Sequence, residues 1–499
     1  MAVGRDALHS NDQDALDQPL LLDPAKLEAE MRSCNHDPDC PGCRVAYLKH
    51  PKASAPLRLL LGLAFVLLCT SLPISVVYPF VYFMVKDFHI ARVDTDIGFY
   101  AGWIGSSFMI GRASTGILWG SIADRFGRKP TMFAGVASVV VLNTLFGLST
   151  NFWMAVTTRF ILGCFNGMLG VVQAYASELC NEEQQPLGLS VVGTAWGLGL
   201  IIGPAVGGYL AQPALKYPSV FTSGSLFDRF PYLLQALCIS SIAVFGLFVV
   251  CLLPETLHRK SSVPKVEDLE KSNPLNSKEE KVESIFRNWP LMAATTLYCL
   301  WSLHDMAYSE LFSLWSVSPK SYGGLGFTSS QVGSVLAVAG CAMLGAQLGV
   351  FPTVCRMVGP IRACRFGALI TIPLLVAYPY FGRIQGPWLS VTVYAAAILK
   401  YILTTAVLTG SFILINNCVK QRQRGAANGF SLSIVSVFKG LGPAIGGIVF
   451  SYAQKRQHSW FFPGDHLVFL FLNVFALLTV LTSFEPFLPK SANRLIADD

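Results

Sequence analysis

Long apolar segments alternate with short polar ones over almost all of the 499-residue chain. A helix needs about 20 mostly apolar residues to cross a bilayer, and longer runs are typical of tilted, packed helices. Twelve segments meet this requirement. The predicted membrane helices comprise residues 58–85, 96–122, 131–149, 152–179, 187–211, 231–253, 288–317, 328–352, 363–382, 388–418, 426–452 and 466–488.

Polar segments divide this series of helices. A Lys- and Glu-rich stretch after the sixth helix is typical of a solvated linker. A polar stretch also precedes the first helix, so we expect no cleavable signal peptide, and the first helix serves as its own insertion signal. The predicted organisation is an N-terminal tail (1–56), a six-helix bundle (57–254), a linker (255–286), a second six-helix bundle (287–489) and a C-terminal tail (490–499).

The two predicted bundles share a sequence pattern. Helix five contains GLIIGPAVGG, and helix eleven contains FKGLGPAIGG. The Gly-Pro pairs begin at Gly203 and Gly442, about half a chain apart. A pattern that recurs at equivalent places in two six-helix halves is typical of transporters built from internal repeats. We therefore predict an all-α membrane protein with twelve transmembrane helices in two pseudo-symmetric six-helix bundles, which resembles the major facilitator fold.

Composition and charge agree with a membrane protein. Hydrophobic residues make up 53% of the chain and charged residues 13%, whereas soluble domains carry about 25% charged residues. No basic stripe with interleaved aromatics is present, so no nucleic-acid partner is expected. No nucleophile–base pair, phosphate loop or metal-protease motif is present either, so we expect neither an enzyme nor a cofactor.

Lys and Arg are distributed unevenly between the predicted loops. With both termini on one side, the loops and linker of that side hold sixteen Lys and Arg residues, and the opposite loops hold eight. Basic residues accumulate in cytosolic loops. Both termini and the linker are therefore predicted to lie in the cytosol.

The loop between helices two and three reads WGSIADRFGRK, which resembles the loop signature of the major facilitator superfamily. Gly120 is expected to let neighbouring helices approach closely, and Gly127 to permit a tight turn. Asp124, Arg125 and Arg128 can form an ion-pair network. The resemblance implies that this network latches the two halves together in the outward-open state. The alternative is an ordinary basic cytosolic loop.

The glycines of helix five form a second motif, which resembles the signature of the antiporters of that superfamily. Gly199, Gly203, Gly207 and Gly208 are expected to form a small-residue face for close packing, and Pro204 to bend the helix. The resemblance implies that this face seals the interface against leak. The alternative is ordinary helix packing.

Helix four carries an arginine, Arg159, within RFILGCFNG. An arginine in an apolar helix is costly and usually faces a polar cavity or a partner. In antiporters with a similar pattern, this arginine is linked to proton exchange. Alternatively, Arg159 snorkels to the nearby membrane interface, because the loop at Asn151 is only a few residues away.

Helix seven holds three ionisable residues, His304, Asp305 and Glu310, in an otherwise apolar span. Such residues are functional candidates by default. A carboxyl group in a low-dielectric interior is harder to ionise and can hold or release a proton near neutral pH. We predict Asp305 and Glu310 as proton-carrying sites and His304 as a relay. Alternatively, the carboxylates form structural pairs with Lys400 or Lys439, and these lysines could instead attract an anionic substrate group.

Other polar residues in the apolar segments are candidates for lining a substrate cavity, although each could instead make a helix–helix hydrogen bond. They are Tyr78, Asn166, Gln173, Tyr308, Lys400, Asn416, Asn417 and Lys439.

The N-terminal tail contains a cysteine cluster, CNHDPDCPGC. Cys40 and Cys43 have the spacing of a zinc knuckle, and Cys34 and His36 could complete four ligands. A disulfide is not expected in a cytosolic tail. Regulatory metal binding and a role without metal both remain open for this cluster.

Four features together resemble the plant zinc-induced facilitator-like transporters: CPGC in the tail, WGSIADRFGRK, SLHDMAYSELFSLW in helix seven, and PETLH after helix six. The resemblance implies a monomeric antiporter that uses protons to export a small metal chelator, such as nicotianamine or a phytosiderophore, and so serves zinc and iron homeostasis. Alternatives are a proton-coupled potassium, drug or auxin exchanger on the same fold, and a non-transporting membrane metal sensor.

Two cellular membranes are candidates for the location of this protein. The tail sequence DQPLLL resembles an acidic dileucine sorting signal, which favours the vacuolar membrane. The plasma membrane is the alternative. The expected partners are the lipid bilayer, protons and a small-molecule substrate.

Overall fold

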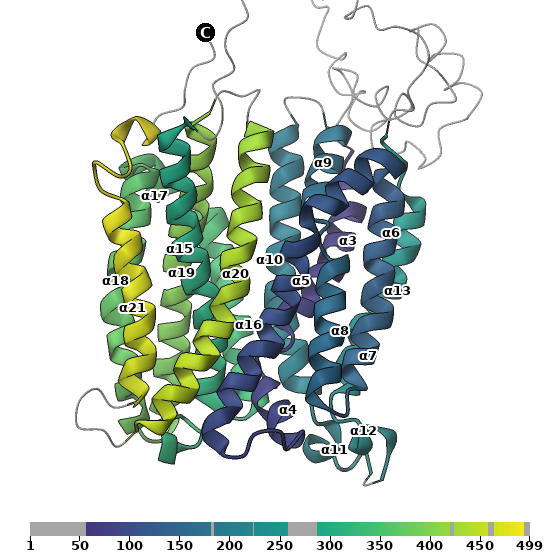
Figure 1. The fold of residues 1–499 in the computed structure, drawn as a ribbon, viewed down its shortest axis with the longest axis vertical. Coiled ribbons are helices and arrows are strands. Elements are labelled where there is room, and N and C mark those ends of the chain that lie inside the picture. Colours follow the sequence, from purple (N-terminus) through teal and green to yellow (C-terminus); the bar gives the residue numbers. More distant parts are fainter. Residues whose placement is uncertain are drawn as a thin grey trace, which may run out of the picture.

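The computed structural model describes residues 56–180, 184–222, 224–257, 287–419, 424–457 and 464–493. Within these residues every regular element is a helix, and the long helices run side by side through the molecule (Figure 1). Ten helical segments are long and apolar enough to span a membrane. Two further helices of 30 and 29 residues, α5 (Ile97–Phe126) and α15 (Trp289–Val317), bring the described total to the predicted twelve.

The first half contains six of these long segments. They are α3 (Leu57–Ser75), α5, α6 (Arg128–Ser138) continued by η2 (Val139–Asn143) and α7 (Thr144–Gly147), α8 (Phe152–Phe165) followed by α9 (Leu169–Leu179), α10 (Gln185–Leu210) and α13 (Leu233–Leu252). Short helices lie between them: α4 (Val81–Asp87), η1 (Asp94–Asp96), α11 (Pro213–Lys216) and α12 (Leu226–Arg229).

The second half repeats this arrangement. Its long segments are α15, α16 (Ser329–Gly345) continued by η5 (Ala346–Val350) and α17 (Phe351–Val358), α18 (Pro360–Ala377), α19 (Pro387–Asn417), α20 (Arg424–Lys455) and α21 (Gly464–Thr482). Short 3₁₀ helices flank them: η4 (Lys320–Tyr322), η6 (Tyr378–Arg383) and η8 (Lys490–Asn493). The two halves stand next to each other in Figure 1, the second in green and yellow.

Two of the predicted helices are interrupted. The first was expected to run over 58–85, but α3 ends at Ser75 and α4 begins only at Val81. Pro79 lies in the break, where its missing N–H cannot serve a helix. The fourth is interrupted at Asn166–Met168. The hydropathy pattern does not register these breaks because the residues on both sides are apolar.

The repeated Gly-Pro motifs pack in equivalent ways in the two halves. A Cβ atom at Gly203 or Gly207 of α10 would overlap Ser75 or Val76, at the end of α3. At Gly442 of α20, a Cβ would lie 2.9 Å from the carbonyl oxygen of Leu303 in α15. In each half, therefore, the fifth helix packs closely on the first, which is how small residues bring membrane helices together.

The last glycine of each motif faces the other half. A Cβ at Gly208 would lie 2.8 Å from the Cα atom of Gly333 in α16, and one at Gly447 would lie 2.8 Å from that of Gly102 in α5. The expected small-residue face is thus confirmed, and it serves two contacts at once. Gly199 belongs to the same face, since its Cβ would overlap Ser71. Pro204 lies inside α10 without ending the helix.

The two halves touch at one end of the molecule and separate toward the other. Gly98 of α5 faces Phe450 of α20, whereas Gly116, about five turns further on the same face, has no described atom within 4 Å of an added Cβ. On α10, Gly208 is in contact with α16, but Gly193 faces open space. The open end carries the start of α3 and the α5–α6 loop. We call it the predicted cytosolic end, and the closed one the opposite end.

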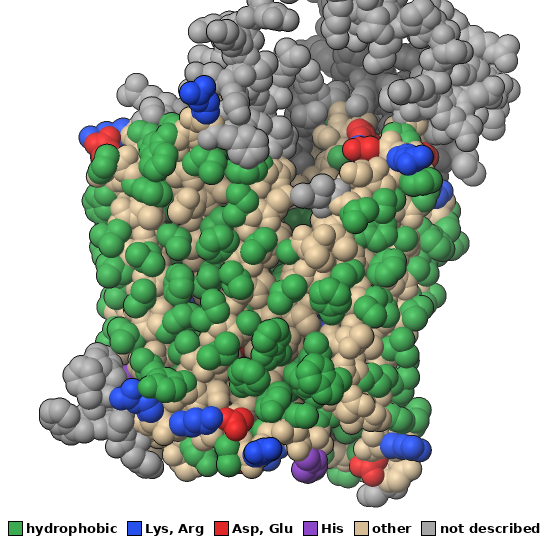
Figure 2. Space-filling view, in the orientation of Figure 1, with side chains coloured by type: hydrophobic (Ala, Val, Ile, Leu, Met, Phe, Trp, Pro, Cys, Tyr) green, Lys and Arg blue, Asp and Glu red, His purple; other side chains and the backbone are tan. Residues whose placement is uncertain are grey.

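The surface fits a protein embedded in a bilayer. On the face seen in Figure 2, charged side chains gather toward the two ends, and hydrophobic side chains cover the broad zone between them. Large apolar side chains of the long helices are exposed, among them Phe248, Leu118 and Trp388. Lipid solvates such a surface, so the chain is a multi-pass membrane protein.

Candidate functional site

Asp305 of helix α15 forms an ion pair within the membrane region. Its Oδ1 atom accepts a 2.6 Å hydrogen bond from Nζ of Lys400 in α19. The Lys400 side chain is 0% exposed and that of Asp305 is 21% exposed. The ammonium group also lies 4.0 Å from the ring centroid of Tyr308. The predicted pairing of Asp305 with Lys400 is thus present, and it leaves the carboxylate partly accessible and the lysine enclosed.

Glu310 lies one and a half turns further along α15, at the interface of the halves. It is completely buried, and within the described chain neither of its carboxyl oxygens has a hydrogen-bond partner. A Cβ at Gly105 of α5 would lie 2.8 Å from its Oε2 atom. The opposite charge that acts on it is that of Arg159 in α8, from the other half. A buried carboxyl without a partner is costly when ionised, so its protonation and the fit of the two halves depend on each other.

Arg159 does not snorkel to the membrane interface, and that alternative is wrong. Its side chain is buried, because the guanidinium group donates to the carbonyl oxygen of Pro73 near the end of α3 and lies over the rings of Phe108 and Phe146. The last carbonyls of a helix lack partners within the helix, so the break after Ser75 creates this acceptor. The polar environment predicted for Arg159 is therefore made by the interrupted first helix.

His304 forms no hydrogen bond with either carboxylate. Its ring stacks on Trp301 at a centroid distance of 4.5 Å, and neither ring nitrogen has a hydrogen-bond partner among the described residues. The relay predicted for His304 is not assembled in this conformation.

The predicted cavity residues fall into two groups. Tyr308 and Lys400 are fully enclosed, and the Tyr308 hydroxyl shares a 2.8 Å hydrogen bond with that of Tyr378, so neither residue lines an accessible cavity here. Asn166 is a helix–helix contact, since its amide donates to the carbonyl oxygen of Thr70 at 2.8 Å.

The remaining candidates are partly accessible or bridge helices. Asn416 of α19 accepts a 2.8 Å hydrogen bond from Asn428 of α20. Asn417 donates to the carbonyl oxygen of Ala492, at the predicted cytosolic end. Tyr78 is mostly buried and contacts Met306 across the two halves. Gln173 and Lys439 are partly exposed, and neither forms a hydrogen bond or ion pair with any described residue.

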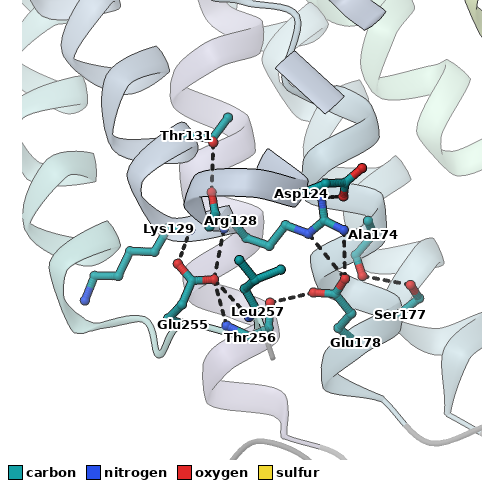
Figure 3. Close-up of polar contacts among 11 residues, drawn as sticks. Asp124, Arg128, Lys129, Thr131, Ala174, Ser177, Glu178, Glu255, Thr256 and Leu257 are labelled. Carbon is teal, nitrogen blue, oxygen red and sulfur yellow. Dashed lines mark hydrogen bonds and ion pairs between the residues drawn. The ribbon is translucent and has the colours of Figure 1, made fainter. Parts of the chain in front are cut away.

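The loop motif forms an ion-pair network, as expected, but with partners that the motif does not contain (Figure 3). Arg128 pairs with Asp124 at 2.7 Å and with Glu178 of α9 at 3.0 Å. Glu255, which was predicted to belong to the linker, accepts the backbone N–H groups of Arg128 and Lys129 at 2.9 and 3.0 Å. A carboxylate at these free N–H groups caps α6, and the N-cap residue Gly127 has no side chain to do so.

The other three predicted residues of this loop are Gly127, Arg125 and Gly120. Gly127 has a φ of +115°, so the predicted tight turn is confirmed. Arg125 lies over the ring of Phe126 and takes no part in the described ion pairs, so it does not join the network in this conformation. Gly120 has no described atom within 4 Å of an added Cβ, because the helices have separated at this end. The close approach predicted for Gly120 is absent from this conformation.

Sequence reasoning overlooked three residues. Arg112 lies in the apolar part of α5, and the rule that singled out His304 applies to it equally. Glu178 and Glu255 come from α9 and from the PETLH segment, and only the fold brings them to Arg128. The tail residues Cys34, His36, Cys40 and Cys43 lie outside the described residues, as does most of the predicted linker.

Comparisons with known proteins identify the family. A family model described as Major Facilitator Superfamily matches residues 63–447. The Arabidopsis thaliana protein ZINC INDUCED FACILITATOR-LIKE 1 is 48% identical over 464 residues, which cover 92% of this chain and 97% of the relative. ZINC INDUCED FACILITATOR 1 of the same plant is 45% identical over 478 residues, covering 93% of this chain and 98% of the relative.

Solved structures agree on the fold. A bacterial homolog of the human lysosomal transporter Spinster has a TM-score of 0.63 at 16% identity, and the match covers 89% of this chain and 100% of that one. A D-xylose-proton symporter has a TM-score of 0.66 at 14% identity, with the same coverage. The chain therefore belongs to the major facilitator superfamily and, within it, to the zinc-induced facilitator family of transporters.

Proposed function

We propose that this chain is a proton-coupled antiporter that exports a small organic solute from the cytosol. The observation that carries the proposal is the Asp305–Lys400 pair. It joins a partly accessible carboxylate to a fully enclosed ammonium group, inside two helices that span the membrane. Protonation of Asp305 would remove the counter-charge of a buried cation, which is costly to leave unpaired. The two protonation states of Asp305 therefore favour different arrangements of α15 and α19, which is the differential stabilisation that coupling needs.

Glu310 supplies a second link, between proton binding and the position of the halves. It is enclosed where α15 meets α5, and it has no hydrogen-bond partner in the described chain. In this conformation its neutral form is favoured because a bare charge is costly to bury. When the halves separate at this end, water can reach the carboxyl group and ionisation becomes cheaper. Glu310 would thus exchange its proton with water on the side of the opposite end, once the halves have separated there.

The solute is proposed to be a metal chelator such as nicotianamine or a phytosiderophore. Two close relatives are named for induction by zinc, which supports a role in zinc and iron homeostasis. Both termini are proposed to lie in the cytosol, and the membrane to be that of the vacuole or the cell surface. The loop network of Asp124 and Arg128 is proposed to latch the halves when the cytosolic end closes.

The test uses the purified full-length chain in proteoliposomes with an imposed pH gradient and radiolabelled nicotianamine. Wild type is expected to show pH-driven exchange, and Asp305→Asn to lose it while inserting normally. Unchanged gradient-driven exchange in Asp305→Asn contradicts the role of Asp305. Counterflow with potassium and auxin in place of nicotianamine identifies an exchanger of another solute. Metal binding by the tail without any flux identifies a sensor.

A second variant separates coupling from folding. Removing one partner of a buried ion pair costs about 3–5 kcal/mol, because the other charge stays buried. Asp305→Asn is therefore expected to lower the melting temperature through Lys400. The double variant Asp305→Asn with Lys400→Gln removes both charges, and it should regain thermal stability without regaining pH-driven exchange. Recovery of exchange in the double variant would show that the pair is structural.

A further inference from the structure

Two cations from opposite halves lie where the halves begin to separate. Arg112 belongs to α5 and Lys439 to α20. Among the glycines of these two helices, Gly440 makes the contact with the other half that lies furthest toward the predicted cytosolic end, since an added Cβ would lie 3.5 Å from the backbone nitrogen of Ile110. Lys439 adjoins this contact on α20, and Arg112 lies two residues beyond it on α5. Both residues therefore stand at the inner limit of the space that opens toward the predicted cytosolic end.

The two positive charges are not neutralised by the protein. Each is partly exposed, and neither has an ion-pair partner among the described residues. Their positions beside the Gly440–Ile110 contact bring the two charges near each other across the interface. Asp305 also acts on Lys439, but its carboxylate is already bonded to Lys400 at 2.6 Å. A pair of like charges in a low-dielectric site is unfavourable unless an anion joins them.

An aromatic side chain orients the guanidinium group. Arg112 lies over the ring of Trp196 from α10, with 4.6 Å between its Cζ atom and the ring centroid. Stacking covers one face of the guanidinium and leaves its N–H edge free, and that edge matches a carboxylate in a bidentate manner.

We propose that Arg112 and Lys439 form a carboxylate-binding site for the transported solute, with Trp196 holding the arginine in place. This inference rests on the proposed function, and it adds the chemistry by which the solute is recognised. Because the two cations come from different halves, a carboxylate held between them draws α5 and α20 together at the place where they now diverge. Bound solute would thus favour closure of the cytosolic end.

Binding is tested without any gradient, by calorimetry on the purified full-length chain. The probe is nicotianamine, and the control compound is the same molecule with its carboxylates esterified. Wild type is expected to bind the acid and not the ester. Because hydrogen bonds to charged groups are the stronger ones, Arg112→Gln and Lys439→Gln should each weaken binding about tenfold or more. Arg112→Lys and Lys439→Arg keep the charge and should recover most of the affinity.

A matched control is Arg92→Gln, which removes an exposed basic residue at the opposite end and should bind like wild type. Equal affinity of the Gln variants and wild type overturns the proposal, as does equal affinity for acid and ester, or no binding at all. Binding without pH-driven flux contradicts the proposed function and supports the carboxylate site. Flux that is unchanged in both Gln variants contradicts the site and supports the proposed function.

Discussion

At the scale of residues, the charged side chains inside the membrane region fall into three groups with different surroundings. Asp305 and Lys400 neutralise each other within the second half. Arg159 and Glu310 are both buried and belong to opposite halves, and no hydrogen bond joins them among the described residues. Arg112 and Lys439 have no ion-pair partner among the described residues, and the guanidinium group of Arg112 lies over the ring of Trp196. The first group lies within one half, the second is buried between the halves, and the third lies where the halves separate. Proton binding, movement of the halves and solute binding can therefore act on different groups.

A further charged residue, Lys216, joins the halves at the opposite end. Its ammonium group donates to the carbonyl oxygen of Gly208 and, at 2.7 Å, to the hydroxyl of Ser329 in α16. Burial lowers the pKa of Lys216 from 10.5 to about 8. The closed arrangement therefore binds fewer protons than an open one with a solvated lysine, between about pH 8 and 10.5. Closure at this end is favoured as pH rises through that range and loses this advantage as pH falls toward 8.

This pH dependence is measured as the distance between spin labels on α10 and α16 at the opposite end. The closed population of the wild-type chain should grow between pH 8 and pH 10. Lys216→Arg stays charged throughout this range and should show no such growth. A wild-type distance distribution that is flat over the range, or equal growth in Lys216→Arg, would contradict the role of Lys216.

At the scale of elements, glycine decides which faces of the helices can meet. Along α5, glycines touch α20 over the closed part of the molecule and face open space beyond it. The motif of α10 makes contacts with two helices: Gly203 and Gly207 pack on the end of α3, and Gly208 packs on α16. The same division recurs for α20 in the second half. One helix in each half thus couples the packing inside its bundle to the contact between bundles.

Two substitutions in α10 test this packing. An added methyl group at Gly207 would overlap the carbonyl oxygen of Val76, so Gly207→Ala should cost about 1–3 kcal/mol through overpacking. Gly193→Ala, in the same helix, meets open space and should be neutral or slightly stabilising. The melting temperature of the detergent-solubilised chain measures both. Equal melting temperatures for the two variants would show that α3 shifts to accommodate the extra methyl group at no cost in stability.

At the scale of the whole molecule, the structure is one state of a transporter, closed at one end and open at the other. The closed end is held by the ion pair of Asp96 with Lys455 at 2.6 Å as well as by Lys216. In the described residues of the open end, the loop network of Asp124 and Arg128 contacts only its own half. Transport by rocking of the halves requires this end to close.

Gly120 tests the closure. Its position in the loop motif predicted a close helix contact, and this conformation leaves it facing open space. Gly120→Leu should therefore fold and melt like wild type but block exchange, because the side chain obstructs the closed cytosolic end. The control Gly382→Leu places the same side chain in open space at the opposite end, in η6. Normal exchange by Gly120→Leu in proteoliposomes would show that the helices do not meet there.

The sequence by itself determined the twelve helices, the two halves and the ionisable residues of α15, because apolar length and charge inside an apolar span are local properties of the chain. It also predicted the turn at Gly127 from one residue type. It did not reveal the break after Ser75, the carbonyl oxygen that receives Arg159, or the cap that Glu255 provides for α6. These features, and the placement of Arg112 and Lys439 beside the same contact of α5 with α20, depend on segments far apart in the chain. Only the packing of the helices brings such segments together, so only the tertiary structure decided which buried charges are paired.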